Sequence, residues 1–221
     1  MGQRTSRSGT TPTAPADARG RGRPIDAAKL AAVRAAAESL FKTRGFDGVA
    51  IEEIAAAAGV SKVTIYKHFG GKDELFRQAV EAKCAQYWPE VVFDTQVRTD
   101  LKLRLRSFGI GFVGLVTSAD VVSFFRLMAM QARDGSDLSQ RFWEAGPERT
   151  LQRLAHLLDA AQQDGELRRL DPVRAAKQFI TLLQGEYQLK CILGVIDAPG
   201  RATIKRHVDE AVDVFLRMYA A

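Results

Sequence analysis

The sequence predicts an all-α protein, in which a small N-terminal helical unit precedes a larger helical domain. Apolar residues recur at spacings of three and four along most of the 221 residues, which is the pattern of amphipathic helices. Glycine and proline interrupt that pattern repeatedly, as expected between helices. No stretch alternates between apolar and polar residues for long enough to predict a strand.

The first 25 residues are expected to form a disordered basic arm. They hold five arginines and one aspartate, a charge of +4 out of +6 for the whole chain. They are also rich in Ser, Thr, Pro and Gly, a composition that predicts disorder. Basic arms often bind nucleic acid, although a solubilising tail has the same composition.

The N-terminal helical unit is expected to contain three or four helices. The first covers residues 26–44, with Asp26 placed to cap it and Gly45 at its end. The fourth carries Asp73 and Glu74 in its first turn, where the helix dipole favours negative charge. The second and third helices are expected at 51–58 and 61–69, and the fourth runs from Lys72 to near Pro89.

The larger domain is expected to contain five helices. The pair Asp171-Pro172 is a strong start signal, because aspartate caps a helix and proline suits its first position. The stretch FGIGFVGLV (108–116) is unusual, since each glycine disfavours a helix by roughly 1 kcal/mol relative to alanine. Either this helix packs very closely on a neighbour, or the missing side chains leave room for a ligand. The expected helices cover 99–117, 119–134, 147–164, 172–194 and 201–219.

The helix expected at 61–69 is barely two turns long, so tertiary packing must stabilise it. Its periodicity places Ile65 and Phe69 on the buried side. An α-helix fits the major groove of DNA. The helix at 51–58, the turn at Gly59 and the helix at 61–69 together predict a helix-turn-helix motif. A solvated polar face on an ordinary helical hairpin is the alternative. The outward face carries Lys62, Val63, Thr64, Tyr66 and Lys67, with His68 at its edge.

Residues 26–86 resemble the DNA-binding domain of the TetR family of bacterial transcriptional regulators. The similar stretches are AAAESLFKTRGFDGV, IEEIAAAAGVS, TIYKHF and KDELF, in the family's order and spacing. The resemblance implies a homodimeric repressor on a pseudo-palindromic double-stranded operator, with its helix-turn-helix motif at about 49–68. It also implies a ligand-binding and dimerisation domain at 87–221, whose last two helices pack against their partner copies. A wholly internal core would use the same apolar stripes on these helices, so both arrangements stay open. Residues 124–195 more faintly resemble the AefR-like type of ligand-binding domain.

The resemblance assigns DNA contacts by position. Bases are expected to meet Lys62, Val63, Thr64 and Lys67. Phosphates are expected to meet Tyr66, His68 and Lys72.

Two neighbouring features bear on the same interface. The family usually has Thr or Ser just before the motif's first helix, whereas this chain has Val49 and Ala50, so a hydroxyl cap is expected to be missing. In the arm, RGRGRP (19–24) resembles the minor-groove core of AT-hook peptides. That resemblance places Arg19, Arg21 and Arg23 in an A·T minor groove.

The second domain is expected to bind a small apolar or amphipathic effector. Eight side chains could line an apolar pocket with a few polar anchors, although each is more often plain core. They are Phe108, Phe112, Phe124, Met128, Trp143, Phe179, Gln184 and Tyr187.

Other classes of protein receive less support. The three histidines are scattered, and no nucleophile motif, metal-ligand spacing or phosphate loop appears, so no enzyme activity, metal or cofactor is expected. An architectural DNA binder without ligand control is the main alternative, and it would have a solidly packed second domain. Activation instead of repression stays open, because promoter geometry decides between them.

The composition indicates a cytoplasmic protein without a membrane partner. The longest apolar run, 108–116, is far shorter than the roughly 20 residues that span a bilayer, and the N-terminus lacks a signal-type apolar segment. Cys84 and Cys191 have neither CxxC nor metal-like spacing, which favours a reducing compartment. A thiol sensor at either cysteine is the alternative.

Overall fold

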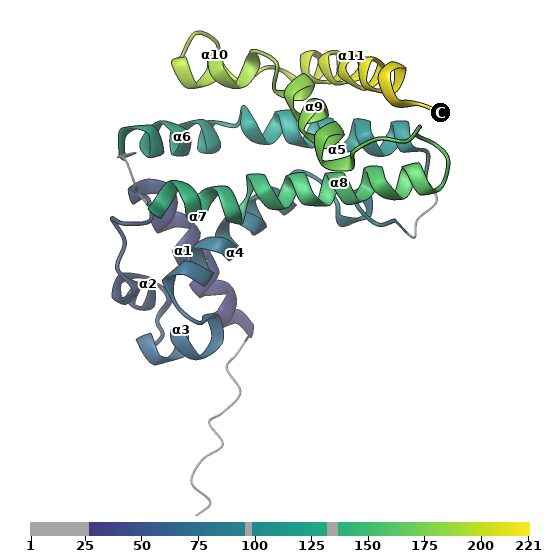
Figure 1. The fold of residues 1–221 in the computed structure, drawn as a ribbon. Helices are drawn as coiled ribbons and strands as arrows, with labels where there is room; N and C mark the ends of the chain where they lie inside the picture. The colour runs from purple at the N-terminus through teal and green to yellow at the C-terminus, as the bar shows by residue number, and fades with distance from the viewer. Residues whose placement is uncertain (1–26, 96–98, 132–136) are drawn as a thin grey trace, which may run out of the picture.

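The computed structural model describes residues 27–95, 99–131 and 137–221, and all of their regular structure is helical (Figure 1). Within these residues no strand forms, and a single isolated bridge pairs Leu167 with Ala220. The all-α prediction is therefore confirmed. The elements are α1 (Ala27–Arg44), α2 (Ile51–Ala58), α3 (Lys62–Phe69), α4 (Lys72–Ala85), the 3-10 turn η1 (Glu90–Val92), α5 (Leu101–Val116), α6 (Ala119–Gln131), α7 (Asp137–Ala145), α8 (Pro147–Gln163), α9 (Pro172–Gln184), α10 (Tyr187–Leu193) and α11 (Arg201–Tyr219).

Two expectations about the helices were wrong. The segment 172–194 is two helices, because the chain turns at Gly185, whose φ of 47° lies in the left-handed region. A Cβ at Gly185 would also lie 3.1 Å from the ring of His207, so glycine allows a close contact there. In addition, α7 forms over a stretch for which no helix was expected.

Two clusters of buried side chains stabilise the two parts of the chain. In the N-terminal unit the rings of Phe41, Phe46 and Phe76 lie 5.2 to 5.9 Å apart, beside the buried Ile54 and Ile65. In the larger domain the rings of Phe108, Phe179 and Phe215 form a second chain of contacts, with all three side chains fully buried. Each cluster is large enough to hold its helices in place by removing apolar surface from water.

The glycines of α5 allow close packing on its neighbours. A Cβ on Gly109 would lie 2.7 Å from a methyl carbon of Val208 in α11. A Cβ on Gly111 would lie 2.2 Å from the carbonyl oxygen of Tyr87, a backbone atom that cannot move aside easily. Of the two explanations for this stretch, close packing therefore holds for Gly109 and Gly111.

The helices place α3 at one end of the molecule and α10 and α11 at the other (Figure 1). Between these ends, α1 and α4 of the N-terminal unit lie beside α6, α7 and α8. Across the described ranges no single helix is long and apolar enough to cross a membrane, and only α5 with most of α6 passes as a pair bent by 56°.

Candidate nucleic-acid interface and ligand cavity

The short helix α3 is defined at both ends by its local sequence. Ser61 caps its start, where the hydroxyl oxygen accepts a hydrogen bond from the backbone N–H of Thr64 at 3.2 Å. Gly70 ends it in the left-handed conformation, with φ of 75°. Ile65 and Phe69 are 0% and 3% exposed, so the two side chains anchor the helix as the periodicity predicted.

The opposite face of α3 is open to solvent. Val63 is 74% exposed and Tyr66 50% exposed. The same face contains the exposed Lys62, Lys67 and His68, together with the partly buried Thr64. A two-turn helix with an apolar anchor and a polar outer face has the form of a major-groove reading helix.

The helix α2 supports α3 through an ion pair between Glu52 and Lys62. This pair lowers the pKa of the Glu52 carboxyl and raises the pKa of the Lys62 ammonium, mainly through their mutual hydrogen bond. Lys62 must therefore leave or share Glu52 before it can bind another acceptor.

A second contact replaces part of the missing cap of α2. Ala50 offers no side-chain acceptor, but the Glu53 carboxylate accepts a hydrogen bond from the Ala50 backbone N–H at 2.8 Å. The same carboxylate binds the Arg44 guanidinium at 2.7 and 3.2 Å, which ties α2 to the end of α1. The hydroxyl cap is absent as expected, and Glu53 satisfies one backbone donor in its place.

Lys72 has a different surrounding from the other assigned DNA contacts. Its ammonium lies 4.1 Å from the ring centroid of Phe46, and partial burial lowers its pKa. Arg141 of α7 lies over the same ring at 5.2 Å. Lys72 is therefore engaged at the junction of the two domains. Arg19, Arg21 and Arg23 of the arm lie outside the described residues.

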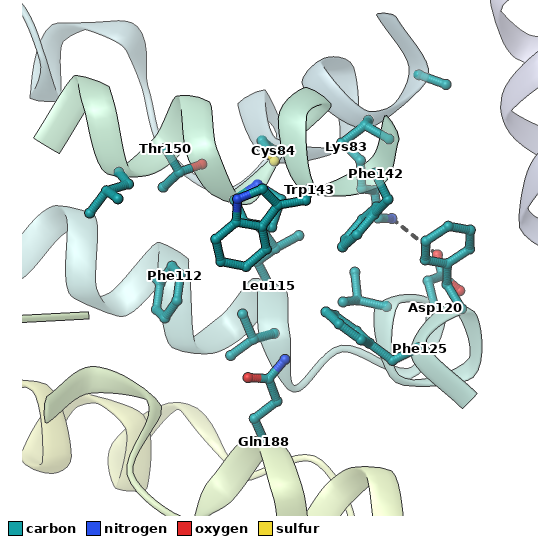
Figure 2. A pocket seen from close by; sticks show the side chains of 18 of the residues that line it. Lys83, Cys84, Phe112, Leu115, Asp120, Phe125, Phe142, Trp143, Thr150 and Gln188 are labelled. Carbon is teal, nitrogen blue, oxygen red and sulfur yellow. Dashed lines mark hydrogen bonds and ion pairs between the residues drawn. The ribbon is translucent and has the colours of Figure 1, made fainter. Parts of the chain in front are cut away.

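A cavity of about 750 Å³ lies where the N-terminal unit meets the larger domain. Figure 2 shows Phe112, Leu115, Phe125, Phe142 and Trp143 around it, with Gln188 extending from another wall. Its volume falls within the usual range for small-molecule sites. The lining residues are Glu38, Phe41 and Lys42 of α1; Phe76, Ala79, Val80, Lys83 and Cys84 of α4; Trp88; Phe112, Leu115 and Val116 of α5; Asp120, Val121, Phe124 and Phe125 of α6; Ser139, Phe142 and Trp143 of α7; Gly146; Pro147, Thr150 and Leu151 of α8; Lys177, Ile180, Thr181 and Gln184 of α9; and Gln188 of α10.

Four of the eight expected pocket residues line this cavity: Phe112, Phe124, Trp143 and Gln184. The other four lie elsewhere. Phe108 and Phe179 are fully buried in the core of the larger domain, and Met128 packs into the cluster of the N-terminal unit. Tyr187 lies against His207, with ring centroids 5.0 Å apart.

Sequence reasoning did not find the wall that α1 and α4 supply. Phe41 and Phe76 belong to the core stripes of their helices, and the same side chains also reach the cavity. Periodicity identifies such residues as buried but does not reveal that a cavity lies beyond them. The side chains across the cavity belong to later helices, and the sequence carries no signal for those contacts.

One ionic cluster lies on the cavity wall. Asp120 at the start of α6 binds Lys42 of α1 at 2.7 Å and Lys83 of α4 at 3.0 Å (Figure 2 shows the second pair). Hydrogen bonds from Lys42 and then Lys83 are the main causes that lower the pKa of the Asp120 carboxyl. A single carboxylate thus joins two helices of the N-terminal unit to the larger domain.

Trp88 supplies the one buried side-chain polar atom that has no hydrogen-bond partner among the described residues, its indole Nε1. The side chain is 3% exposed and lines the cavity. Buried donors are nearly always paired, so this unpaired donor is an exception among the described residues.

Neither cysteine has the surroundings of a reactive thiol. Burial raises the pKa of Cys84 to about 11, and it also raises the pKa of Cys191. Both thiols are therefore protonated at neutral pH, the form that reacts slowly. Within the described part of the chain no group of three His, Cys, Asp or Glu side chains could hold a metal ion.

A helix-turn-helix head joined to a helical domain is the architecture of a DNA-binding transcriptional regulator, and two family models agree with it. Residues 33–79 match "Bacterial regulatory proteins, tetR family", and residues 103–221 match "AefR-like transcriptional repressor, C-terminal domain". The second match covers more than half of the chain. The protein belongs to the TetR family of transcriptional regulators.

Solved structures share this fold. The flavonoid-responsive regulator FrrA is 32% identical, with a TM-score of 0.65 over 87% of this chain and 97% of that one. A TetR-family regulator from Mesorhizobium loti is 24% identical, with a TM-score of 0.67 over 89% of this chain and 100% of that one.

A curated relative matches over a shorter stretch. The negative transcriptional regulator IcaR of the biofilm operon icaADBC, from Staphylococcus epidermidis, is 33% identical over 50 residues. Those residues make up 23% of this chain and 26% of IcaR, so the chain spans about a quarter of that relative's length.

Proposed function

We propose that this regulator is a homodimeric repressor that leaves its operator when a small apolar or amphipathic molecule enters the cavity. The observation that carries the proposal is the position of α1 and α4. They pack around α3 through one buried cluster, and they also form one wall of the cavity. A molecule in the cavity therefore contacts the helices that position the reading helix.

On DNA, the exposed face of α3 would enter the major groove. Val63, Thr64 and Lys67 would meet base edges, and Val63 is exposed enough to pack on a thymine methyl group. Lys62 would join them after it leaves Glu52. Tyr66 and His68 would bind phosphates. Lys72 would bind a phosphate only if its ammonium leaves the ring of Phe46.

The partner copy would pack on the end of the molecule opposite α3. Leu189 and Leu193 of α10 are 61% and 67% exposed, and Val214 and Met218 of α11 are also exposed. Exposed apolar residues on neighbouring helices are typical of a subunit interface. Two copies joined there would present two α3 helices to one face of the DNA.

Release requires that the ligand bind the DNA-free arrangement more tightly than the DNA-bound one. A ligand between α4 and the helices α6 to α8 would change how the N-terminal unit sits on the larger domain. The name of FrrA describes it as flavonoid-responsive, which supports a small effector for a chain 32% identical to it. The description of IcaR as a negative regulator supports repression.

The cavity also separates this proposal from its main rival. An architectural DNA binder without ligand control would have a solidly packed second domain. A cavity of about 750 Å³ lined largely by apolar side chains does not fit that expectation.

The base-reading role of α3 can be tested by binding-site selection from random duplexes. The wild-type protein should select a pseudo-palindrome, and Lys67→Ala should change the preferred base at one symmetric pair of positions. Loss of a good base contact costs about 1–3 kcal/mol of discrimination. Tyr66→Phe, which removes only a hydroxyl at an assigned phosphate contact, should weaken all sequences about equally.

Lys205→Ala on α11 is the matched control, because it removes an exposed lysine far along the chain from α3. It should select the wild-type sequence. An unchanged sequence preference for Lys67→Ala would show that Lys67 does not read bases.

A further inference from the structure

We propose that the cavity binds an organic acid. The apolar body of the acid would lie among the aromatic side chains of the cavity, and its anionic group would bind Lys42 and Lys83 in place of Asp120. This inference rests on the proposed function, since it names the chemistry of the same effector. Its structural basis is the cluster of Lys42, Lys83 and Asp120 on the cavity wall.

The charges around the cavity favour an anion. The charged residues that line it are three lysines and two carboxylates, a net charge of +1. Lys42 and Lys83 share one partner, Asp120, so each ammonium has donors left for a second acceptor. The remaining charged residues are Glu38 of α1 and Lys177 of α9.

The cluster is open enough for an exchange of partners. The side chains of Lys42 and Asp120 are 49% and 41% exposed, and that of Lys83 is 23% exposed. An ion pair in such surroundings is weak, so a ligand carboxylate can replace Asp120 at little cost. The apolar part of the ligand would then lie among Phe124, Phe142 and Trp143.

The same exchange would transmit the signal. Asp120 joins α1 and α4 to the start of α6 through Lys42 and Lys83. A carboxylate on the ligand would satisfy the lysines without holding α6, so the N-terminal unit would lose that connection to the larger domain. An acid would therefore act as a stronger effector than a neutral molecule of the same shape.

The test compares acids with their neutral counterparts on the full-length protein. The probes are decanoate with 1-decanol, and biphenyl-4-carboxylate with biphenyl-4-methanol, each titrated by calorimetry at pH 7.5, where carboxylates are ionised. Both tryptophans of the chain, Trp88 and Trp143, line the cavity, so a shift in the wavelength of tryptophan emission confirms the site for the decyl pair. Each acid should bind roughly two- to fivefold tighter than its alcohol, and added salt should reduce the difference.

Variants locate the anionic group. Asp120→Asn removes the competing carboxylate, so the preference for the acid should increase. Lys42→Gln with Lys83→Gln should abolish the preference while the alcohols still bind. Lys190→Gln, on α10 and outside the cavity lining, should keep the wild-type preference.

The outcomes distinguish the two proposals. Equal binding of acids and alcohols would overturn the organic-acid inference and leave the ligand cavity supported. Loss of the preference in Lys177→Gln, with Lys42→Gln and Lys83→Gln unaffected, would also overturn it, since the acid would then lie on the other wall. Failure of all four probes to bind would contradict the ligand-binding function itself.

Discussion

A Thr150→Phe protein should bind its operator as the wild type does and respond poorly to effectors. Thr150 is 8% exposed, belongs to α8 and lines the cavity, where Figure 2 shows it near Phe112 and Trp143. A phenyl ring there would occupy space that the ligand needs. Steric changes in an apolar pocket alter affinity by roughly 10- to 200-fold, so decanol and decanoate should both bind at least about tenfold more weakly.

The control for this variant is Gln152→Phe, which places the same ring on the exposed side of the same helix. It should keep wild-type affinity for both probes. Operator affinity, measured by fluorescence anisotropy, should be equal for the two variants, because neither residue is in the N-terminal unit. Wild-type affinity of Thr150→Phe for both probes would show that they do not occupy this cavity.

The second large effect is expected at the proposed subunit interface, where Leu193→Glu should convert the dimer to monomers. The substitution places a charge on a side chain that is 67% exposed in α10 and would be buried against the partner copy. A monomer binds one half-site only, so it loses the gain from two linked contacts. That gain is typically about 100-fold or more, and operator affinity should fall accordingly.

Analytical ultracentrifugation at micromolar concentration checks the oligomeric state. Val91→Glu is the matched control, because Val91 in η1 is 51% exposed and lies outside the proposed interface. It should remain dimeric with wild-type operator affinity. A dimeric Leu193→Glu protein would place the interface on another surface.

The reading helix could be predicted from sequence because its information is local. Ile65 and Phe69 are one turn apart, and burial of that pair determines which residues face outward. Ser61 and Gly70 mark the ends of the helix by their own chemistry. The sequence of this eight-residue helix is therefore sufficient to predict which of its sides is buried.

The cavity could not be predicted in full because it depends on distant parts of the chain. Its walls bring Phe41 and Phe76 of the N-terminal unit to Phe112 and Trp143 of the larger domain. Phe108 and Phe179 look the same as these aromatic residues in sequence, but they lie in solid core. Only the packing of the helices separates the two groups.

Glycines gave an intermediate case. Glycines disfavour a helix, so the sequence indicated that Gly109 and Gly111 serve a purpose. Close packing on a neighbouring helix and room for a ligand were both consistent with it. The structure supports close packing, because the nearest atoms to a Cβ are Val208 and the Tyr87 carbonyl. The helix break at Gly185 could not be predicted, because a single glycine within a helical pattern is common. Its left-handed φ is visible only in the fold.

The most direct test of the whole account is the spacing of the two half-sites in the selected operator. Five base pairs inserted at the centre of symmetry would turn the second half-site by about half a helical turn, to the opposite face of the DNA. Anisotropy titrations should then show a loss of affinity of roughly 100-fold, while the same five base pairs inserted outside the operator should have no effect. Equal affinity for the original and the centrally expanded operator would contradict recognition by a rigid dimer with two α3 helices.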